Sequence, residues 1–433
     1  MLSNTTTLLL LSFSHIVKLE LGKLPGLRSI FSPASLFGTL IPTYFWNPGL
    51  SWQWQWRNQA AIYTISLDVA RQFLFLKGQF DWRIDSDHAN GAEWSRHRRI
   101  LSLAFTPETF GGLNALVWEE TTTLYHQMLQ AEGWTRESDI MISAIDRITT
   151  KFALILIARC GFGQPISWDT PPQISGMPLG EALVIVSGMY RLPIKRLHDI
   201  EMAYTSLAAF MKENSDPQRK DVFRLMIRAS EGEGKLHMTD DELAGNTFLM
   251  LFAGHETTAK TLDAVIGFLA WYEDVQEEVY QEIKKVMSEE GKLTCGELIK
   301  VQSCFLEVAR LFQTTETVVL KTDEEDGHGG QVILEPGTRV AVDVVGLHYN
   351  PKYFPNPEEF RPSRWCGMSE SGMTMFSVGP RSCIGRRFAL TEGVAFLSNL
   401  LRDWKLHIRA RVMRGVTAMT LGVGEVPVRL TRR

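Results

Sequence analysis

One cysteine of this chain lies in a glycine-rich segment whose residue types suit a metal ligand. The segment Phe376–Ala389 places Cys383 between Gly379 and Gly385. An apolar pattern at helical spacing runs from Ile384 to Leu401, so we expect Cys383 at the N-terminus of a helix. There the helix dipole and the free backbone N–H groups stabilise a thiolate. Such a thiolate is a good axial ligand for a haem iron, because it donates electron density that favours O–O bond cleavage.

The neighbouring residues fit the same interpretation. Gly379 allows the chain to turn with positive φ or to approach a flat ligand closely, and we expect Gly385 to do the same on the far side of the sulfur. Arg381 is placed to pair with an anionic haem propionate, and Phe376 to cover the sulfur and limit access of water. The alternative is a buried structural cysteine in a loop. The combination of residue types at these spacings favours the haem ligand.

This segment resembles the haem-binding signature of the cytochrome P450 family of haem-thiolate monooxygenases. The resemblance covers roughly Phe80 to Arg409 and is weak before Phe80. It implies haem b as cofactor, Cys383 as ligand of the iron, and insertion of one oxygen atom from O2 into a hydrophobic small organic substrate. The sequence has no nucleotide-binding GxGxxG motif or flavin domain, so we expect electrons from NADPH through a separate flavin reductase.

A second segment whose residues could take part in catalysis lies inside a predicted helix from Thr239 to Tyr272, which begins with a capping box. Gly254 in this helix costs roughly 1 kcal/mol relative to alanine, so it needs a local reason, and close approach to a flat ligand is one. Thr257 lies on the same face as Ala253. Its hydroxyl can therefore bond the backbone carbonyl of Ala253 and open the helix slightly.

The same segment matches the acid–alcohol pair of cytochrome P450s. The resemblance implies that Glu256 and Thr257 help to relay protons during O2 activation, which is general acid catalysis. In the alternative interpretation Glu256 is a solvated residue paired with Lys260 four positions later, and the threonines only pack. His255 is interpreted as a tolerated helix position rather than a ligand.

Two further sets of residues match the family. Glu307 and Arg310 lie three residues apart on a predicted helix, and Arg364 follows in a later loop, as in the family's buried Glu–Arg–Arg network. Buried ion pairs are not obviously stabilising, so the implied role is to fix the cysteine loop. Trp94 and Arg98 match the family's propionate-binding pair, with a solvated basic face as the alternative.

A basic patch near the haem would steer an acidic redox partner, although a solvated surface explains the same residues. Five basic residues are candidates for this patch: Arg96, His97, Arg99, Arg386 and Arg387.

Composition places the chain among ordinary globular proteins. It has 433 residues, of which 45% are hydrophobic, and a net charge of −4, which gives no reason to expect nucleic acid as a partner. Its five cysteines show no paired or metal-type spacing, and this is typical of a reducing compartment. We expect an apolar, membrane-proximal segment over residues 1–50 and a haem-thiolate monooxygenase domain over residues 51–433.

The N-terminal region leaves membrane association open. The apolar run Leu8–Val17 is too short to span a bilayer. The tryptophans at 52, 54 and 56 suit either a membrane interface or a packed core. Membrane-bound family members carry an N-terminal anchor helix, which we expect to be truncated here or reduced to surface association. The resemblance implies the cytoplasmic face of the endoplasmic reticulum and a role in secondary metabolism.

The pattern of elements predicts a mostly α fold with a minor β system, which is an α+β class and a cytochrome P450-like fold built as one large haem-binding domain. The predicted helices are Glu93–Ala104, Asn114–Glu132, Ile142–Arg159, Ile200–Lys212, Asp221–Glu231, Thr239–Tyr272, Glu273–Ser288 and Gly296–Leu311. The predicted strands are Ala60–Ser66, Val318–Thr322, Gln331–Leu334, Arg339–Val345 and Lys405–Arg409.

Two regions are short relative to the family pattern, Trp56–Phe80 and Glu181–Leu197. Two alternatives to the monooxygenase stay open, and the short regions motivate the second of them. One is a haem-thiolate isomerase or dehydratase, against which Glu256 and Thr257 argue. The other is a haem-binding protein that has lost its activity.

Overall fold

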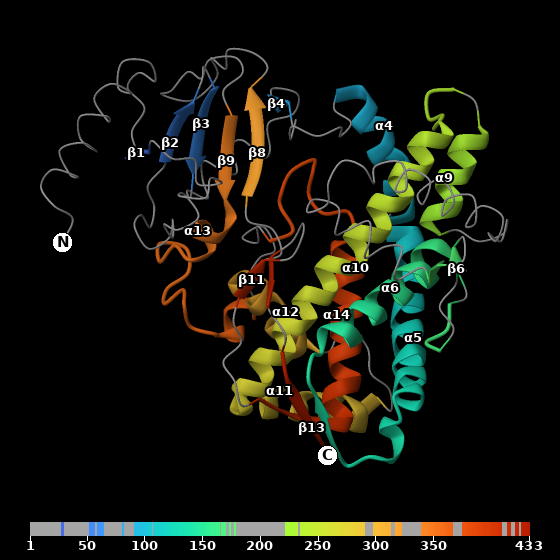
Figure 1. The fold of residues 1–433 in the computed structure, drawn as a ribbon, viewed down its shortest axis with the longest axis vertical. Helices are drawn as coiled ribbons and strands as arrows, with labels where there is room; N and C mark the ends of the chain where they lie inside the picture. The colour runs from blue at the N-terminus through green and yellow to red at the C-terminus, as the bar shows by residue number, and fades with distance from the viewer. Residues whose placement is uncertain are drawn as a thin grey trace, which may run out of the picture. The chain divides into compact units, whose positions relative to one another are not determined.

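The computed structural model describes residues 27–29, 52–56, 59–64, 80–81, 91–105, 107–164, 166–169, 173–174, 177–178, 221–232, 234–290, 298–312, 317–322, 339–366, 375–408, 414–416, 421–423 and 426–433. The chain forms two compact units (Figure 1). The first unit consists of residues 1–95, 315–359 and 369–383, and the second of residues 96–314, 360–368 and 384–433. Each unit is described by itself.

The first unit contains a mixed sheet with the strand order β1-β2-β3-β9-β8-β4. Its strands are β1 (Leu27–Ser29), β2 (Trp52–Trp56), β3 (Gln59–Thr64), β9 (Arg339–Asp343), β8 (Thr317–Thr322) and β4 (Phe80–Asp81). Only the β1–β2 and β3–β9 pairs are parallel. Three predicted strands are therefore confirmed, and the tryptophan-rich segment is a strand, β2, paired with β3. The boundary after residue 50 stays a prediction.

The second unit is mainly helical. Its helices are α5 (Pro107–Ala131), α6 (Asp146–Phe162), α9 (Val222–Glu231), α10 (Asp240–Trp271), α11 (Glu273–Glu290), α12 (Ile299–Leu311) and α14 (Arg386–Asp403). Helix α4 (Gly91–Ser102) crosses the boundary between the units, and the short helix α13 (Val344–His348) belongs to the first. Most predicted helices are thus confirmed, whereas Ile200–Lys212 and the strand Gln331–Leu334 lie outside the described residues.

The start of α10 shows why this helix was predictable. The Thr239 hydroxyl accepts a hydrogen bond from the Glu242 N–H at 3.2 Å, and the Glu242 carboxylate accepts one from the Thr239 N–H at 2.8 Å. This reciprocal capping box satisfies two of the backbone donors that a helix start leaves open. The helix that follows packs along α6 in the second unit (Figure 1).

An aromatic cluster joins α5, α6 and α14 in the core of the second unit. The ring centroids of Phe152 and Phe396 lie 4.6 Å apart in an edge arrangement, and Tyr125 lies 6.4 Å from Phe396. All three side chains are fully or almost fully buried. Burial of such large apolar side chains is the main source of stability in a core.

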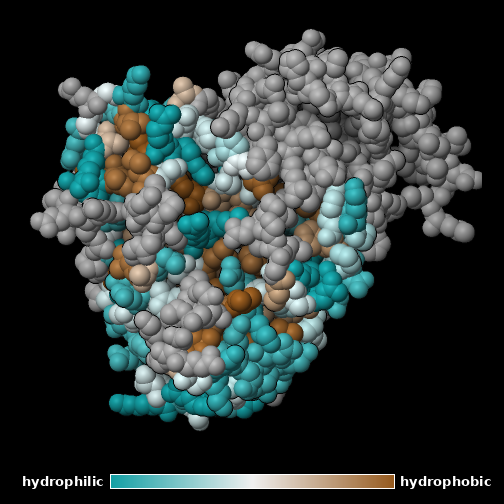
Figure 2. Space-filling model, turned by 180° about the vertical axis from the view of Figure 1, so that it is seen from behind, coloured by the Kyte–Doolittle hydropathy of each residue, from teal (hydrophilic) through white to brown (hydrophobic). Residues whose placement is uncertain are grey.

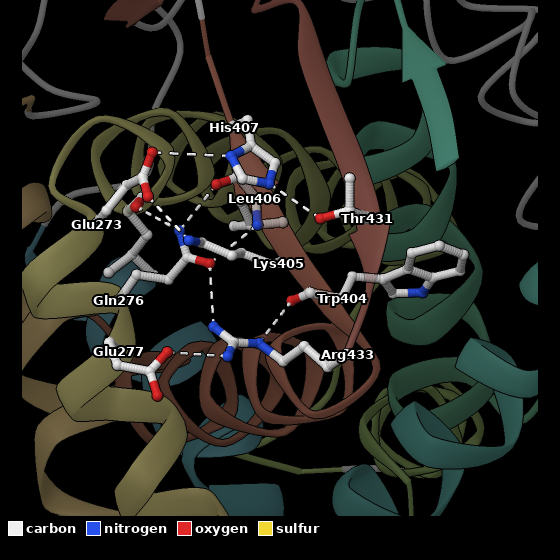
Figure 3. Close-up of polar contacts among 10 residues, drawn as sticks. Glu273, Gln276, Glu277, Trp404, Lys405, Leu406, His407, Thr431 and Arg433 are labelled. Atoms are coloured by element: carbon white, nitrogen blue, oxygen red, sulfur yellow. Dashed lines mark hydrogen bonds and ion pairs between the residues drawn. The ribbon is translucent and has the colours of Figure 1, made fainter. Parts of the chain in front are cut away.

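A three-stranded antiparallel sheet, ordered β10-β13-β5, closes one end of the second unit. Its strands are β10 (Trp404–His407), β13 (Val428–Arg432) and β5 (Asp139–Ile142). The side-chain amide of Gln276 on α11 donates to the Leu406 carbonyl at 3.0 Å and accepts from the Leu406 N–H at 2.9 Å. Arg433 contacts Glu277 and the Trp404 carbonyl beside it (Figure 3).

The described surface shows apolar residues in separate patches among hydrophilic ones on the face seen in Figure 2. Large apolar side chains with more than half of their surface exposed include Met141, Trp271 and Ile299. Within the described residues, no helix combines the length and apolar character that crossing a bilayer requires.

Candidate functional site

The cysteine loop of the first unit is closed by two backbone hydrogen bonds. The Cys383 N–H donates to the Phe376 carbonyl at 2.8 Å, and the Ser382 N–H donates to the Gly379 carbonyl at 3.1 Å. Gly379 has φ +79°, the positive value that the sequence predicted, and Ser377 also has a positive φ of 56°. Since a non-glycine residue adopts this region at a cost, the backbone around the cysteine is held in a specific shape.

Helix α14 begins later than the sequence indicated. Gly385 is its N-cap residue, so Cys383 precedes the first helical residue, Arg386, by three positions. Gly385 has φ −88°, so the positive φ that was one expectation for it is not found, and its close approach to a flat ligand stays a prediction. Within the part of the chain that the structure describes, a Cβ added at Gly385 would meet no atom within 4 Å. The Cys383 side chain is exposed, as a soft ligand for a metal centre must be.

Trp94 and Arg381, predicted separately as propionate ligands, lie together in the first unit. The Arg381 guanidinium carbon lies 4.3 Å from the centre of the Trp94 ring, which is a cation–π arrangement. Stacking of this kind holds the planar guanidinium while its edge N–H groups remain directed outward. An indole N–H and a guanidinium are both donors suited to a carboxylate. These donors, together with the exposed thiol, fit a haem with its propionates.

The second half of α4 is held to the start of α10 within the second unit. Arg96 donates to both carboxylate oxygens of Glu242, one of them at 2.9 Å, and also to the His237 carbonyl. His97 Nε2 lies 3.3 Å from the same carboxylate. The Arg96 hydrogen bond is the main cause that lowers the pKa of Glu242 to about 2. Arg96 and His97 are thus engaged with Glu242. Arg98, the next residue, is half-buried.

The predicted hydrogen bond of Thr257 on α10 is confirmed, and the slight opening of the helix stays a prediction. The Thr257 hydroxyl donates to the Ala253 carbonyl at 2.8 Å, where both residues lie on one face of the helix. Ala253 is exposed, and Glu256 and Thr257 are half-buried. His255 is buried, with Nδ1 2.7 Å from the Leu251 carbonyl, and burial lowers its pKa. His255 therefore belongs to the helix interior, as the sequence interpretation held.

Gly254 has a packing reason that the sequence did not reveal. A Cβ at this position would lie 2.8 Å from Cγ1 and 3.1 Å from Cδ1 of Ile157 on α6. Ile157 is 4% exposed, and its Cδ1 also lies 3.1 Å from the Cβ position of Gly161 in its own helix. Close packing of α6 on α10 thus requires a glycine here. The role of Gly254 toward a flat ligand stays a prediction.

Lys260 makes an ion pair different from the one considered in the sequence. Its Nζ lies 3.6 Å from Oδ2 of Asp263, and the Lys260 side chain is 13% exposed. Asp263 is fully buried on α10, and its Oδ1 accepts a hydrogen bond from the Thr149 hydroxyl of α6 at 2.5 Å. Burial raises the pKa of Asp263 to about 6, a value that Asp146 also raises while Thr149 and Lys260 lower it.

The ion network of the second unit has the predicted centre and two members that the sequence missed. Glu307 accepts from Arg310 at 2.9 and 2.8 Å and from Arg364 Nε at 3.1 Å. It also accepts from the Trp365 indole at 2.9 Å and the Arg361 N–H at 3.1 Å. Glu307 and Arg310 are fully buried. Because five hydrogen bonds meet one carboxylate, the network ties α12 to the segment 361–365.

Comparison with known proteins points to one family. The family model for cytochrome P450 matches residues 70–429. A protein of Postia placenta described as cytochrome P450 monooxygenase 124 is 33% identical over 94% of this chain and 94% of its own length. Cytochrome P450 3A13 of Mus musculus is 29% identical over 79% of this chain and 71% of its own length.

The fold resembles that of a solved structure. A crystal structure of the cytochrome P450DA heme domain matches with a TM-score of 0.76 and 19% identity, and covers 95% of this chain and 98% of that one. Since sequence, relatives and fold agree, the chain belongs to the cytochrome P450 family, and it is a monooxygenase that binds haem b through a cysteine thiolate.

Proposed function

We propose that Cys383 is the thiolate ligand of the haem iron. The observation that supports this assignment best is that its exposed thiol lies in a loop closed by the hydrogen bond from the Cys383 N–H to the Phe376 carbonyl, three residues before α14. Among the other cysteines that the structure describes, Cys160 and Cys304 are buried, and burial raises the pKa of Cys304 further from ionisation. Cys366 is exposed, but its sulfur lies 3.7 Å from the Ser303 hydroxyl on α12, next to the Glu307 network.

The other candidate residues are assigned roles toward the cofactor or toward protons. Bound haem supplies the redox centre at which O2 is activated for insertion into the substrate. Trp94, Arg98 and Arg381 bind its carboxylates through N–H donors. Phe376 limits access of water to the sulfur, and Gly379 and Gly385 shape the loop.

Proton handling falls to the acid–alcohol pair on α10, beside Ala253 and Gly254. The Thr257 hydroxyl donates its hydrogen to the Ala253 carbonyl, so its oxygen lone pairs can accept a hydrogen bond from another donor. Glu256, one residue earlier, supplies an acid within the same turn. This division of roles, acceptor and acid, is what an ordered proton delivery needs.

The substrate is a hydrophobic small organic molecule, and the electrons come from NADPH through a separate flavin reductase. The separate reductase rests on the resemblance to the cytochrome P450 family. Of the other members of the basic patch, Arg99 and Arg387 are exposed and Arg386 is half-buried. These three are the cations proposed for an acidic partner surface. Association with the cytoplasmic face of the endoplasmic reticulum and a role in secondary metabolism rest on the family resemblance.

The ligand assignment is tested by the carbon monoxide spectrum of the reduced protein. Cys383→Ser is expected to abolish the long-wavelength absorption of a thiolate-ligated complex, whereas the matched variant Cys366→Ser retains it. A spectrum unchanged by Cys383→Ser would overturn the assignment. Turnover that depends on NADPH and a reductase separates the monooxygenase from an isomerase, which would consume a hydroperoxide alone.

A further inference from the structure

A buried carboxylate lies behind the proposed proton relay. On α10, Asp263 follows Glu256 by seven residues, which is about two helical turns. Lys260 stands between them, four residues after Glu256 and three before Asp263, so the three side chains share one helix face. One cation therefore has two carboxylates within its reach along the helix.

In the structure Lys260 is paired with Asp263, the buried one of the two carboxylates. Lys260 Nζ lies 3.6 Å from Asp263 Oδ2, longer than a hydrogen bond but within an ion pair. The other oxygen, Oδ1, is fixed by the Thr149 hydroxyl at 2.5 Å. Asp263 is fully buried and Lys260 is largely buried, so water screens their attraction weakly.

We propose that Asp263 and Lys260 form a charge switch in which ionised Asp263 holds the Lys260 ammonium away from Glu256. The inference rests on the proposed role of Glu256 in the relay. When Asp263 is neutral, Lys260 loses its anion there, and Glu256 at the favourable i,i+4 position becomes its partner. A paired ammonium keeps Glu256 ionised, and an ionised carboxylate has no proton to deliver.

The switch operates in the pH range in which the Asp263 carboxyl changes its charge. Burial raises the pKa of Asp263 to about 6. The charged groups that act on it are Lys260 on α10, which lowers this pKa, and Asp146 on α6, which raises it; the Thr149 hydroxyl also lowers it. The net result is a carboxylate that holds Lys260 at neutral pH and releases it in mildly acidic solution. Asp263 and Lys260 are thus positioning residues for Glu256.

The test measures the holoenzyme with NADPH and a flavin reductase, without added substrate. Electrons then leave as hydrogen peroxide or, after two more electrons and protons, as water, so poor proton delivery raises the peroxide released per NADPH consumed. In the unaltered protein this ratio is expected to rise as the pH falls through about 6. Asp263→Asn is expected to show the high ratio at every pH.

The rescue distinguishes a switch from a structural role. Lys260→Gln is expected to keep the ratio low at every pH, and Asp263→Asn combined with Lys260→Gln is expected to behave like Lys260→Gln alone. A double variant that keeps the high ratio of Asp263→Asn, or an unaltered pH step in either single variant, would overturn the proposal.

A second readout does not depend on turnover. In infrared difference spectra, the carboxyl band that Glu256→Gln removes is expected to change with pH in step with the band that Asp263→Asn removes, and this coupling is lost in Lys260→Gln. Independent titration of the two bands counts against the switch. If Glu256→Gln leaves the peroxide ratio unchanged, the relay assignment itself fails. If Glu256→Gln raises the ratio while the Lys260 and Asp263 variants do not, only the switch fails.

Discussion

Replacing Gly254 with alanine tests the packing of α10 on α6. The new methyl group would lie 2.8 Å from Ile157 Cγ1, closer than carbon atoms approach in folded proteins. Ile157 has little room to yield, because it is β-branched and 4% exposed. Overpacking costs about 1–3 kcal/mol, against a helix propensity gain of about 1 kcal/mol. We expect a net loss of up to about 2 kcal/mol in the free energy of unfolding.

Gly245 is the matched control in the same helix. It is exposed, and a Cβ there would meet nothing within 4 Å, so Gly245→Ala is expected to stabilise by roughly 0.5–1 kcal/mol. Urea unfolding of both variants measures the difference. In an Ile157→Ala background, Gly254→Ala should lose most of its cost, because the clashing atoms are gone. The reasoning is refuted if Gly254→Ala stabilises the protein as much as Gly245→Ala does.

Three further predictions concern the buried and clustered carboxylates. Glu307→Gln leaves buried guanidinium groups without their counter-charge and should lower the free energy of unfolding in urea by about 3–5 kcal/mol. Its control, Glu278→Gln, removes an exposed ion pair and should change the free energy of unfolding by at most about 1 kcal/mol. Equal losses in the two variants would contradict this prediction. Burial raises the pKa of Asp263 from its ordinary 3.8 to about 6. As the pH rises across that interval, the free energy of unfolding of the unaltered protein should fall by about 3 kcal/mol, and that of Asp263→Asn should not. Parallel curves of unfolding free energy against pH for the two proteins would contradict this prediction. The pKa of Glu242 is lowered to about 2, so its stabilisation is present above its ordinary pKa and is lost as the pH falls toward 2. Glu242→Gln should therefore remove this part of the fall in thermal stability at acid pH. The same fall in both proteins would contradict this prediction.

The fold was predictable where local signals are strong. Helix α10 has a capping box and a long apolar pattern, and its predicted bounds differ from the structure by one residue at each end. Strands β5 and β13 were missed because their pairing joins segments almost 300 residues apart, and a single sequence does not show such a partner. The predicted helix Ile142–Arg159 therefore began four residues too early, since Ile142 ends strand β5.

The site was predictable where a residue type and its spacing are typical of one chemical role. A lone cysteine between glycines and the Glu307–Arg310 spacing each point to a specific role. The neighbours supplied by other elements could not be predicted. Examples are Ile157 of α6, which faces Gly254, and Thr149 of α6, which bonds Asp263. Helical periodicity indicates which face a residue occupies, but it does not indicate which helix packs against that face.

The amide of Gln276 has a consequence for self-association. β10 is an edge strand, and an edge with free N–H and C=O groups recruits strands from other molecules. Gln276 presents one donor and one acceptor to Leu406, as a neighbouring strand would, and so occupies that position with a side chain. Helix α11 thereby acts as a cap on the sheet, and a Gln276→Ala protein would expose a template for intermolecular β-sheet growth while its haem chemistry stayed intact.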